Sequence, residues 1–327
     1  MKPFNVFPYD SNIDFMRMRW VSLSVAFLLM VVALGAMGAR GFNFALDFTG
    51  GTLVEVEFAE TTEQSAVTER LEAAGIEGAL VQRFSGTSFS VRLSPKAVAE
   101  DEAAAAADAG LADGNAATAG RVLEALSAGG AKVEIKRSEF VGPQVGAELA
   151  YNGIIAVLVV LAGIMIYIGL RFEWKFAVAT VVGEAHDVIV TLGVFAIMGY
   201  DFDLTVLAAI LAVDGYSVND KIVVFDRVRE LFRATRKDTP QDVINRAINS
   251  TLSRTIMTSL TTLLTCIALY IWGGPTLEGF AMALIVGIVV GTASTIFFAS
   301  PLLLTLGVTK EDLMPKAKDD AELNRRP

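Results

Sequence analysis

Long apolar runs, separated by short polar stretches, dominate the pattern of residues along this chain. A hydrocarbon core about 30 Å thick is crossed by roughly 20 residues of α-helix. Six runs reach that length, and they predict transmembrane helices over residues 20–39, 150–170, 176–198, 204–225, 255–272 and 279–304. The third and fourth runs differ from the others because they hold charged residues inside the apolar stretch.

The first run also has a feature of secretory signal peptides. Gly35, Ala36, Gly38 and Ala39 are small residues of the kind that precede a cleavage site. The apolar stretch is longer than the core of a typical signal peptide, which has about 7 to 15 residues. The sequence therefore favours an uncleaved anchor, and cleavage is the alternative.

The distribution of Lys and Arg predicts which side of the membrane each loop faces, because the cytoplasmic loops of membrane proteins are enriched in basic residues. Basic residues precede the first run, lie between the second and third, and crowd the segment 226–254, whereas the short loops on the other side have none. We therefore expect both termini, residues 1–19 and 305–327, to be cytoplasmic. Residues 226–254 are then a cytoplasmic amphipathic loop, and residues 40–148 are an exported, periplasmic domain.

Within residues 40–148 the pattern changes to short alternating runs. Thr52 to Phe58 alternates apolar and polar side chains, which is the period of a half-buried strand. Helical stripes at Val67 to Ala74 and Val122 to Leu126, a hairpin across Ser85-Gly86, and a last strand through Val133 and Ile135 complete the order βαββαβ. This order predicts an α+β, ferredoxin-like domain with helices on one face of an antiparallel sheet. An Ala-rich insert, Lys96 to Asn115, is expected to extend a helix or form a surface loop.

Composition narrows the classes of function. The chain of 327 residues is 53% hydrophobic and 19% charged, as expected of a membrane protein. Its net charge of -9, without a basic stripe, argues against a nucleic-acid partner. A single cysteine, Cys266, excludes a disulfide framework within the chain.

The exported domain holds no combination of residues that suggests catalysis. It has no His, no phosphate-binding loop and no metal-ligand spacing, so we expect no enzymatic activity, no cofactor and no metal. Its acidic residues, 17 against 9 basic ones, are interpreted as a solvated face. The alternative is a surface that grips an extended chain, for which an exposed sheet edge suffices.

Charged residues inside the apolar runs are candidate functional residues, because each costs about 2.5–3.5 kcal/mol to insert at mid-membrane. Asp220 lies about 9 Å of helix before Asp226 at the cytoplasmic boundary, and Arg254 enters the fifth run from the same side. The two can meet if these helices pack together. The full set is Glu184, His186, Asp187, Asp214, Asn219, Asp220, Lys221 and Arg254.

A proton relay is the function that this arrangement favours. A carboxylate that separates from its guanidinium partner in a low dielectric takes up a proton, so we assign relay roles to Asp220, Arg254, Asp187 and His186. The alternative is a static buried salt bridge that fixes helix register. Lys221 is interpreted as a side chain that snorkels to the cytoplasmic interface.

Two further patterns concern packing. Ala283, Gly287 and Gly291 recur at i+4 and predict a ridge of small residues that allows close helix approach. Thr239-Pro240 predicts a helix start, and an apolar stripe including Ile248 continues that helix into the fifth run.

Several motifs along the chain are similar to those of a known family. They are Leu46-Asp47-Phe48-Thr49-Gly50-Gly51-Thr52 after the first run, Val141-Gly142-Pro143-Gln144-Val145-Gly146 before the second, Gly215-Tyr216-Ser217-Val218-Asn219-Asp220 in the fourth, Phe225-Asp226-Arg227-Val228-Arg229-Glu230 after it, Asn249-Ser250-Thr251-Leu252-Ser253-Arg254-Thr255 before the fifth, and Ala185-His186-Asp187 in the third. Together they resemble SecF-type subunits of the SecD/SecF protein-export family, which belongs to the RND-type superfamily. The sequence departs from the family at Asp214 and Glu184, where apolar or small residues are usual.

The resemblance implies a six-helix half of an RND-type bundle in the bacterial inner membrane. It implies an auxiliary subunit of the Sec preprotein translocase that, with SecD, uses the proton-motive force to complete export of unfolded proteins. The implied partners are SecD, the SecYEG channel, a YajC-like accessory subunit, preprotein substrates, membrane lipid and, indirectly, SecA. By motif, Asp220 and Arg254 correspond to the family's proton-pathway residues. Two alternatives are an RND-type exporter of small molecules or lipids and a structural scaffold for the channel, which does not need Asp220.

Overall fold

The chain is described by a computed structural model that covers residues 11–93, 111–128, 130–235, 237–309 and 312. Residues 96–110 of the expected Ala-rich insert and the outer parts of both expected cytoplasmic termini lie outside these residues. The described chain divides into two compact units. We call residues Met1–Phe42, Val157–Tyr200 and Thr205–Pro327 the helical unit, and residues Asn43–Ala156 and Asp201–Leu204 the α/β unit.

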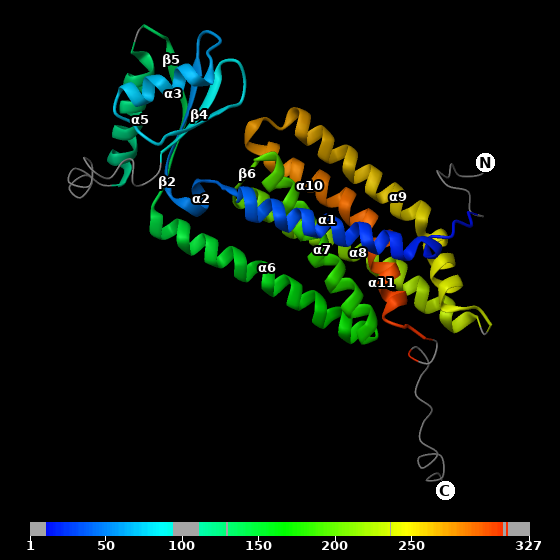
Figure 1. Cartoon of the computed structure of the whole chain (residues 1–327). Coiled ribbons are helices and arrows are strands. Elements are labelled where there is room, and N and C mark those ends of the chain that lie inside the picture. The colour runs from blue at the N-terminus through cyan, green and yellow to red at the C-terminus, as the bar shows by residue number, and fades with distance from the viewer. Residues whose placement is uncertain (1–10, 94–110, 129, 236, 310–311, 313–327) are drawn as a thin grey trace. The chain divides into compact units, whose positions relative to one another are not determined.

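Long helices build the helical unit (Figure 1). In chain order they are α1 (Arg19–Arg40), α6 (Pro143–Arg171), α7 (Trp174–Met198), α8 (Leu204–Ala234), α9 (Pro240–Trp272), α10 (Pro275–Ser294), the π-helix η2 (Thr295–Ala299) and α11 (Ser300–Thr305), with the short 3-10 helix η1 (Met16–Met18) before α1. Among the described residues, five stretches are long and apolar enough to cross a membrane: Met16–Arg40, Gln144–Arg171, Trp174–Met198, Pro240–Trp272 and Thr276–Thr305. The remaining expected span, residues 204–225, corresponds to α8, whose 31 residues include Asp214, Asp220 and Lys221 within its apolar run.

Small residues allow the helices of this unit to approach closely. A methyl group at Gly193 on α7 would overlap Ala33 on α1, and one at Gly287 on α10 would overlap Val213 on α8. A methyl group at Gly291 would lie 2.7 Å from the hydroxyl of Ser217 on α8. The close approach predicted from the ridge of small residues is therefore confirmed for Gly287 and Gly291.

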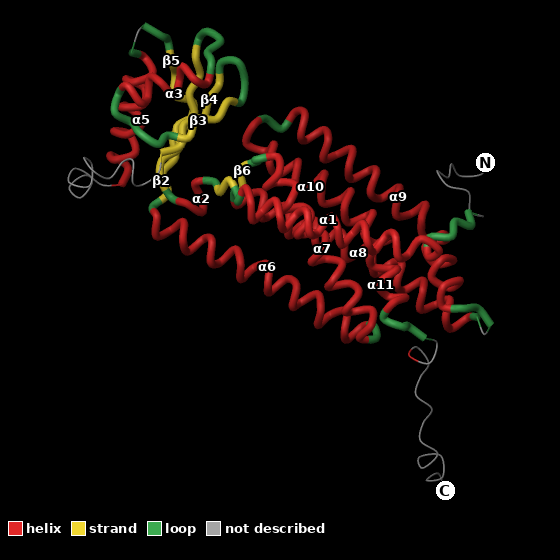
Figure 2. Tube along the Cα trace, in the orientation of Figure 1, coloured by secondary structure: helices red, strands yellow, loops and turns green. Residues whose placement is uncertain are grey.

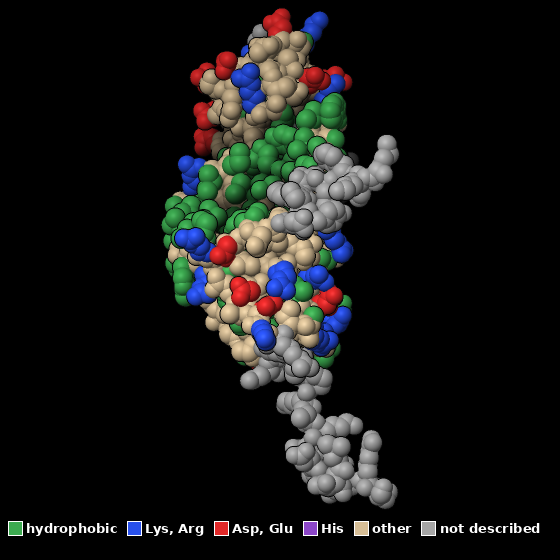
Figure 3. All heavy atoms as spheres, turned by 90° about the vertical axis from the view of Figure 1, so that its right-hand side faces the viewer, with side chains coloured by type: hydrophobic (Ala, Val, Ile, Leu, Met, Phe, Trp, Pro, Cys, Tyr) green, Lys and Arg blue, Asp and Glu red, His purple; other side chains and the backbone are tan. Residues whose placement is uncertain are grey.

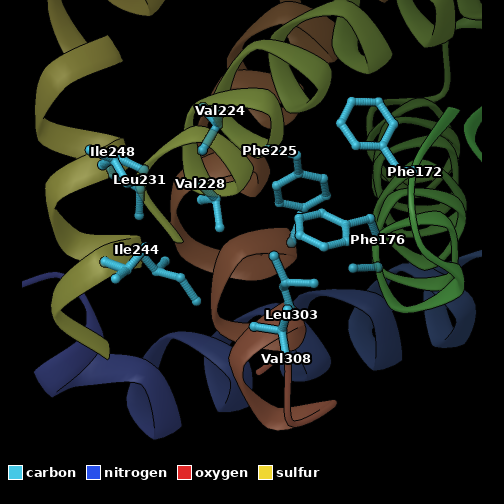
Figure 4. Packing of buried hydrophobic residues seen from close by; sticks show 14 of the residues in the cluster. Phe172, Phe176, Val224, Phe225, Val228, Leu231, Ile244, Ile248, Leu303 and Val308 are labelled. Carbon is cyan, nitrogen blue, oxygen red and sulfur yellow. The ribbon is translucent and has the colours of Figure 1, made fainter. Parts of the chain in front are cut away.

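An apolar core forms where α8 ends and α9 begins. Phe176 and Phe225 meet edge to face with ring centroids 5.5 Å apart, and Ile244 and Ile248 of α9 point toward the same centre (Figure 4). The helix start predicted at Thr239 is confirmed as a capping box, in which the Thr239 hydroxyl accepts the Asp242 N–H and the Asp242 carboxylate accepts the Thr239 N–H. From that cap, α9 runs without a break to Trp272.

The α/β unit contains a four-stranded antiparallel sheet, shown in yellow in Figure 2. Its elements follow in the order β2 (Gly51–Phe58), α3 (Gln64–Ala73), β3 (Leu80–Arg83), β4 (Ser88–Leu93), α5 (Leu111–Ser127) and β5 (Val133–Val141), and the strand order is β3-β4-β2-β5. Alternation in β2 buries Val54 and Val56, which lie opposite Val91 and Phe89 of β4. Both helices pack on this set of residues, so they cover one face of the sheet.

A second, two-stranded sheet is absent from the sequence predictions. β1 (Asn43–Phe44) pairs in parallel with β6 (Asp201–Phe202), and the short helix α2 (Leu46–Thr49) follows β1. Strands of two residues carry no periodic signal. This explains why the hydrophobic pattern does not reveal them.

Candidate functional site

The interior of the helical unit contains a group of buried charged side chains from two helices. Glu184 and Asp187 are three residues apart on α7, and Asp214, Ser217 and Lys221 recur at i+3 and i+7 on α8. This spacing places each set on one face of its helix. Because the two faces meet, residues that are distant in sequence form one polar cluster.

Lys221 lies at the centre of this cluster and is fully buried. Its Nζ lies 2.8 Å from Glu184 Oε1, 2.8 Å from Asp187 Oδ2 and 2.6 Å from Ser217 Oγ. The ammonium donates hydrogen bonds to Asp187 and Ser217, and it forms an ion pair with Glu184 without a hydrogen bond to Oε1. The interpretation of Lys221 as a snorkelling side chain is therefore wrong, because two carboxylates inside the bundle offset the cost of burying its charge.

Asp187 accepts hydrogen bonds from side chains of two other helices, α8 and α10. Besides Lys221, its Oδ2 accepts from Ser217 Oγ at 2.9 Å and from Ser294 Oγ of α10 at 2.8 Å. Its Oδ1 lies 3.0 Å from His186 Nδ1. The His186 ring stacks on Phe298 with centroids 4.6 Å apart. The structure therefore brings His186 and Asp187, two of the residues with predicted relay roles, into contact and packs the imidazole against an aromatic ring.

Asp220 occupies a separate position, because consecutive residues of a helix point about 100° apart. Its Oδ1 accepts a hydrogen bond from Thr255 Oγ1 of α9 at 2.6 Å, and its buried Oδ2 has no hydrogen-bond partner among the described residues. Arg254 is exposed and lies close enough for its charge to act on Asp220. The two form no ion pair within 4.0 Å in the described part of the chain, so the contact that the sequence left conditional is not made.

A π-helix supplies a part of this region that sequence reasoning missed. Pro301 has no N–H to donate to the preceding turn, and η2 lies in that turn. The Ser300 hydroxyl donates to Thr295 O at 2.8 Å, which matches the wider π spacing. Ser294, directly before η2, reaches Asp187, and the only sequence signal for it is a polar residue in an apolar run.

The family-motif residues of the α/β unit have backbone roles. Asp47 Oδ2 accepts the N–H of Leu204, the first residue of α8, at 2.9 Å and so caps that helix. Gly50 and Gly51 have φ values of 67° and 121°, which glycine adopts without the steric cost that a side chain would bring. A side chain at Gly146, in the motif that begins Gly142-Pro143, would lie 3.0 Å from the N atom of Gly50, so the two motifs pack directly together. The ring of Phe48 stacks on Phe202 of β6.

An ion pair joins the two sheets of the α/β unit. The buried Arg92 of β4 donates to Asp201 Oδ2 at 2.7 Å and to Phe44 O at 2.8 Å. Burial raises the pKa of Asp201, against the opposing effect of the Arg92 charge. Neither residue was predicted, because nothing in the local sequence indicates that β4 meets the loop before α8.

The remaining motif residues of α8 lie outside the buried cluster. Gly215 and Asn219 are exposed, and Tyr216 donates to Ser259 at 3.3 Å. Asp226 lies 3.6 Å from Arg171, and Arg227 forms an ion pair with Glu230. Figure 3 shows Lys and Arg side chains beside Asp and Glu on one face of the helical unit. Asn249, from the motif before Arg254, binds both the N–H and the carbonyl of Ile13, which fixes the segment before η1.

Comparison with known proteins gives matches over nearly the whole chain. The family described as protein export membrane protein SecD/SecF, C-terminal, matches residues 121–309, and the SecD/SecF GG motif matches residues 35–62. The chain is 41% identical over 303 residues to the protein translocase subunit SecF of Escherichia coli O157:H7, covering 92% of this chain and 90% of that one. It is 42% identical over 328 residues to the protein of the same description in Vibrio alginolyticus, covering 99% and 100% of the two chains.

Solved structures give the same result for the fold. The crystal structure of SecDF, a translocon-associated membrane protein from Thermus, matches with a TM-score of 0.80 and 37% identity. A second structure, of SecDF in a super-membrane-facing form, matches with a TM-score of 0.66 and 38% identity. The matches cover 92% and 93% of this chain but only 39% of each SecDF chain, so this chain spans well under half of those proteins.

Proposed function

Because this chain belongs to the SecD/SecF family of protein-export membrane proteins, we propose that it is an auxiliary, non-catalytic subunit of the Sec preprotein translocase. With a SecD partner, it uses the proton-motive force to complete export of unfolded proteins across the bacterial inner membrane. The similarity to SecDF over 39% of that chain supports a partner that supplies the rest of the assembly. The RND-type exporter of small molecules or lipids has less support, because the relatives named above are translocase subunits.

The observation that carries this proposal is the environment of Asp220. Its carboxylate is buried in the helical unit, holds one hydrogen bond from Thr255, and keeps one oxygen without a donor in the described residues. A proton bound there removes the buried charge, which the low dielectric of the interior disfavours. Arg254 lies at the adjacent position on α9, so a small movement of α8 against α9 makes or breaks the pair and moves the proton.

Proton transfer at this position provides enough free energy for mechanical work. One proton moving down about 100 mV releases about 2.3 kcal/mol, and each pH unit adds about 1.4 kcal/mol. Shifting a two-state arrangement from 1:99 to 99:1 takes about 5.5 kcal/mol. A few protons per cycle are therefore sufficient, with Asp187 and His186 as further members of the relay.

The proposal includes the topology that the sequence predicts. We take α8 as the fourth of six spans, which completes half of an RND-type bundle with both termini in the cytoplasm and with residues 40–148 in the periplasm. The order β2-α3-β3-β4-α5-β5 and the strand order of the sheet support a ferredoxin-like periplasmic domain. SecYEG, a YajC-like subunit, SecA and emerging preproteins are the partners that family membership suggests.

Replacing Asp220 with Asn tests this function. We expect the part of preprotein export that depends on the proton-motive force to disappear, because an amide cannot bind and release the proton. Export of a secreted reporter into inverted membrane vesicles, with and without a proton gradient, measures this, and copurification with SecD shows that the complex is intact. Glu148→Gln, which changes an exposed carboxyl group on α6 outside the family motifs, is the control and is expected to export normally. Unimpaired gradient-dependent export by Asp220→Asn refutes the relay.

A further inference from the structure

Two acidic side chains contact each other inside the helical unit, and neither belongs to the four residues that were assigned relay roles from the sequence. The carboxyl groups of Glu184 on α7 and Asp214 on α8 lie within hydrogen-bond reach of one another. Glu184 is fully buried and Asp214 is 3% exposed. The family relay at Asp220 does not use either residue.

Both carboxyl groups have oxygens without a hydrogen-bond donor. Both carboxylate oxygens of Glu184 and Oδ1 of Asp214 are buried and have no hydrogen-bond partner among the described residues, although Glu184 Oε1 lies 2.8 Å from Lys221 Nζ. Buried polar atoms without partners are rare in native proteins and need an explanation. Two carboxylates in contact cannot both ionise without strong repulsion, and one shared proton supplies the donor that is missing.

The balance of charges around Glu184 and Asp214 also favours a proton bound to the pair. Lys221 provides one positive charge and pairs with the carboxylate of Asp187. Asp187 has three further partners, the hydroxyls of Ser217 and Ser294 and the imidazole of His186. The ionisable residue of α10, Glu278, lies in its first turn, about 20 Å of helix from the cluster. Asp220 contacts Thr255 of α9 rather than the pair, and Arg254, exposed on α9, acts on Asp220. One lysine therefore faces three carboxyl groups, and full ionisation leaves two negative charges uncompensated.

We propose that Glu184 and Asp214 share one exchangeable proton and form a second proton-binding site of the bundle, separate from Asp220. The proton comes from water and returns to water, and a single carboxyl O–H bond forms and breaks. Lys221 lies 2.8 Å from both Glu184 and Asp187, so loss of the proton draws the ammonium toward Glu184 and uptake releases it toward Asp187. The existence of this proton-binding site does not depend on the proposed export function. A role of the site in coupling proton transfer to export does rest on that function.

Infrared spectroscopy of the purified full-length chain in lipid nanodiscs tests the proposal, because a protonated carboxyl group has its own C=O stretching band. We expect one such band near neutral pH that shifts in heavy water and disappears as pH is raised. Glu184→Gln and Asp214→Asn are each expected to remove it, because the remaining carboxylate ionises against the new amide donor. Glu230→Gln and Asp220→Asn are expected to retain it.

Two results overturn the proposal. One is a spectrum in which neither Glu184→Gln nor Asp214→Asn loses a carboxyl band, although both variants melt cooperatively. The other is loss of the band when sodium replaces choline at constant pH, which identifies the occupant as a metal cation. A band that persists in Asp220→Asn while export fails separates this site from the function proposed above.

Discussion

Lys221 shows how one buried residue depends on its neighbours. Its ammonium contacts the hydroxyl of Ser217, four residues before it on α8, and two carboxylates of α7 that local sequence does not connect to it. From sequence alone, a lysine near the end of an apolar run has a simpler explanation, since its long stem reaches the interface. The ion pairs with Glu184 and Asp187 of α7 decide that Lys221 is a buried counter-ion and not a side chain at the interface. These ion pairs depend on how α7 packs against α8.

Replacing Lys221 with Met tests this dependence. We expect a loss of about 3–5 kcal/mol in the free energy of unfolding, because the carboxylates that remain are buried without a cation. Thermal unfolding in detergent, followed by circular dichroism, measures the effect. Lys237→Met makes the same change at an exposed position and is expected to leave the melting temperature within error. Equal melting of the two variants contradicts the assignment of Lys221 as a structural counter-ion.

At the scale of elements, helix contacts follow the small residues that the sequence displays. Gly287 and Gly291 were identified by their spacing, and they do face α8. Gly193 has the tightest fit with α1, yet it has no partner at i+4 to mark it. Spacing within one helix identifies a ridge, but it does not identify a single glycine whose importance comes from the opposite helix.

Gly193→Ala and Gly163→Ala separate packing from helix propensity. At Gly193 the new methyl overlaps Ala33, so we expect a loss of about 1–3 kcal/mol in unfolding free energy. At Gly163 on α6 nothing lies within 4 Å, and we expect a gain of about 0.5–1 kcal/mol, because alanine favours the helix. Urea unfolding of both variants measures the two values. A gain at Gly193 of the size found at Gly163 is incompatible with close contact between α1 and α7.

At the scale of the whole molecule, the chain builds two hydrophobic cores that share no residue. One joins α7, α8, α9 and α11, and the other joins the four-stranded sheet with α3 and α5. Each core is buried by elements of its own unit. The apolar faces of α1 and α6 are exposed, with Trp20, Phe27, Leu158 and Ile166 each at least 60% accessible, as expected of surfaces that meet lipid or another subunit.

A fragment spanning residues 50–142 is expected to fold by itself, because it contains every residue of the second core. It should be soluble and unfold cooperatively on heating, as followed by circular dichroism. Val91→Asp, at a fully buried position, is expected to abolish that transition, whereas Leu80→Asp, at a position 62% exposed, is expected to preserve it. If the fragment shows no cooperative transition, the prediction is wrong, and residues outside 50–142 are needed for the stability of this domain.

The sequence by itself determined the features that repeat along one segment: the apolar runs, the alternation in β2, the Thr239 cap and the ridge at Gly287 and Gly291. Each reports the period of a helix or strand, so a single chain segment carries the information. Tertiary structure alone decided that Lys221 pairs with Glu184 and Asp187, that Asp220 binds Thr255 instead of Arg254, and that Glu184 contacts Asp214. These contacts depend on the rotation of each helix and on its neighbours, and both are set by packing across the whole unit.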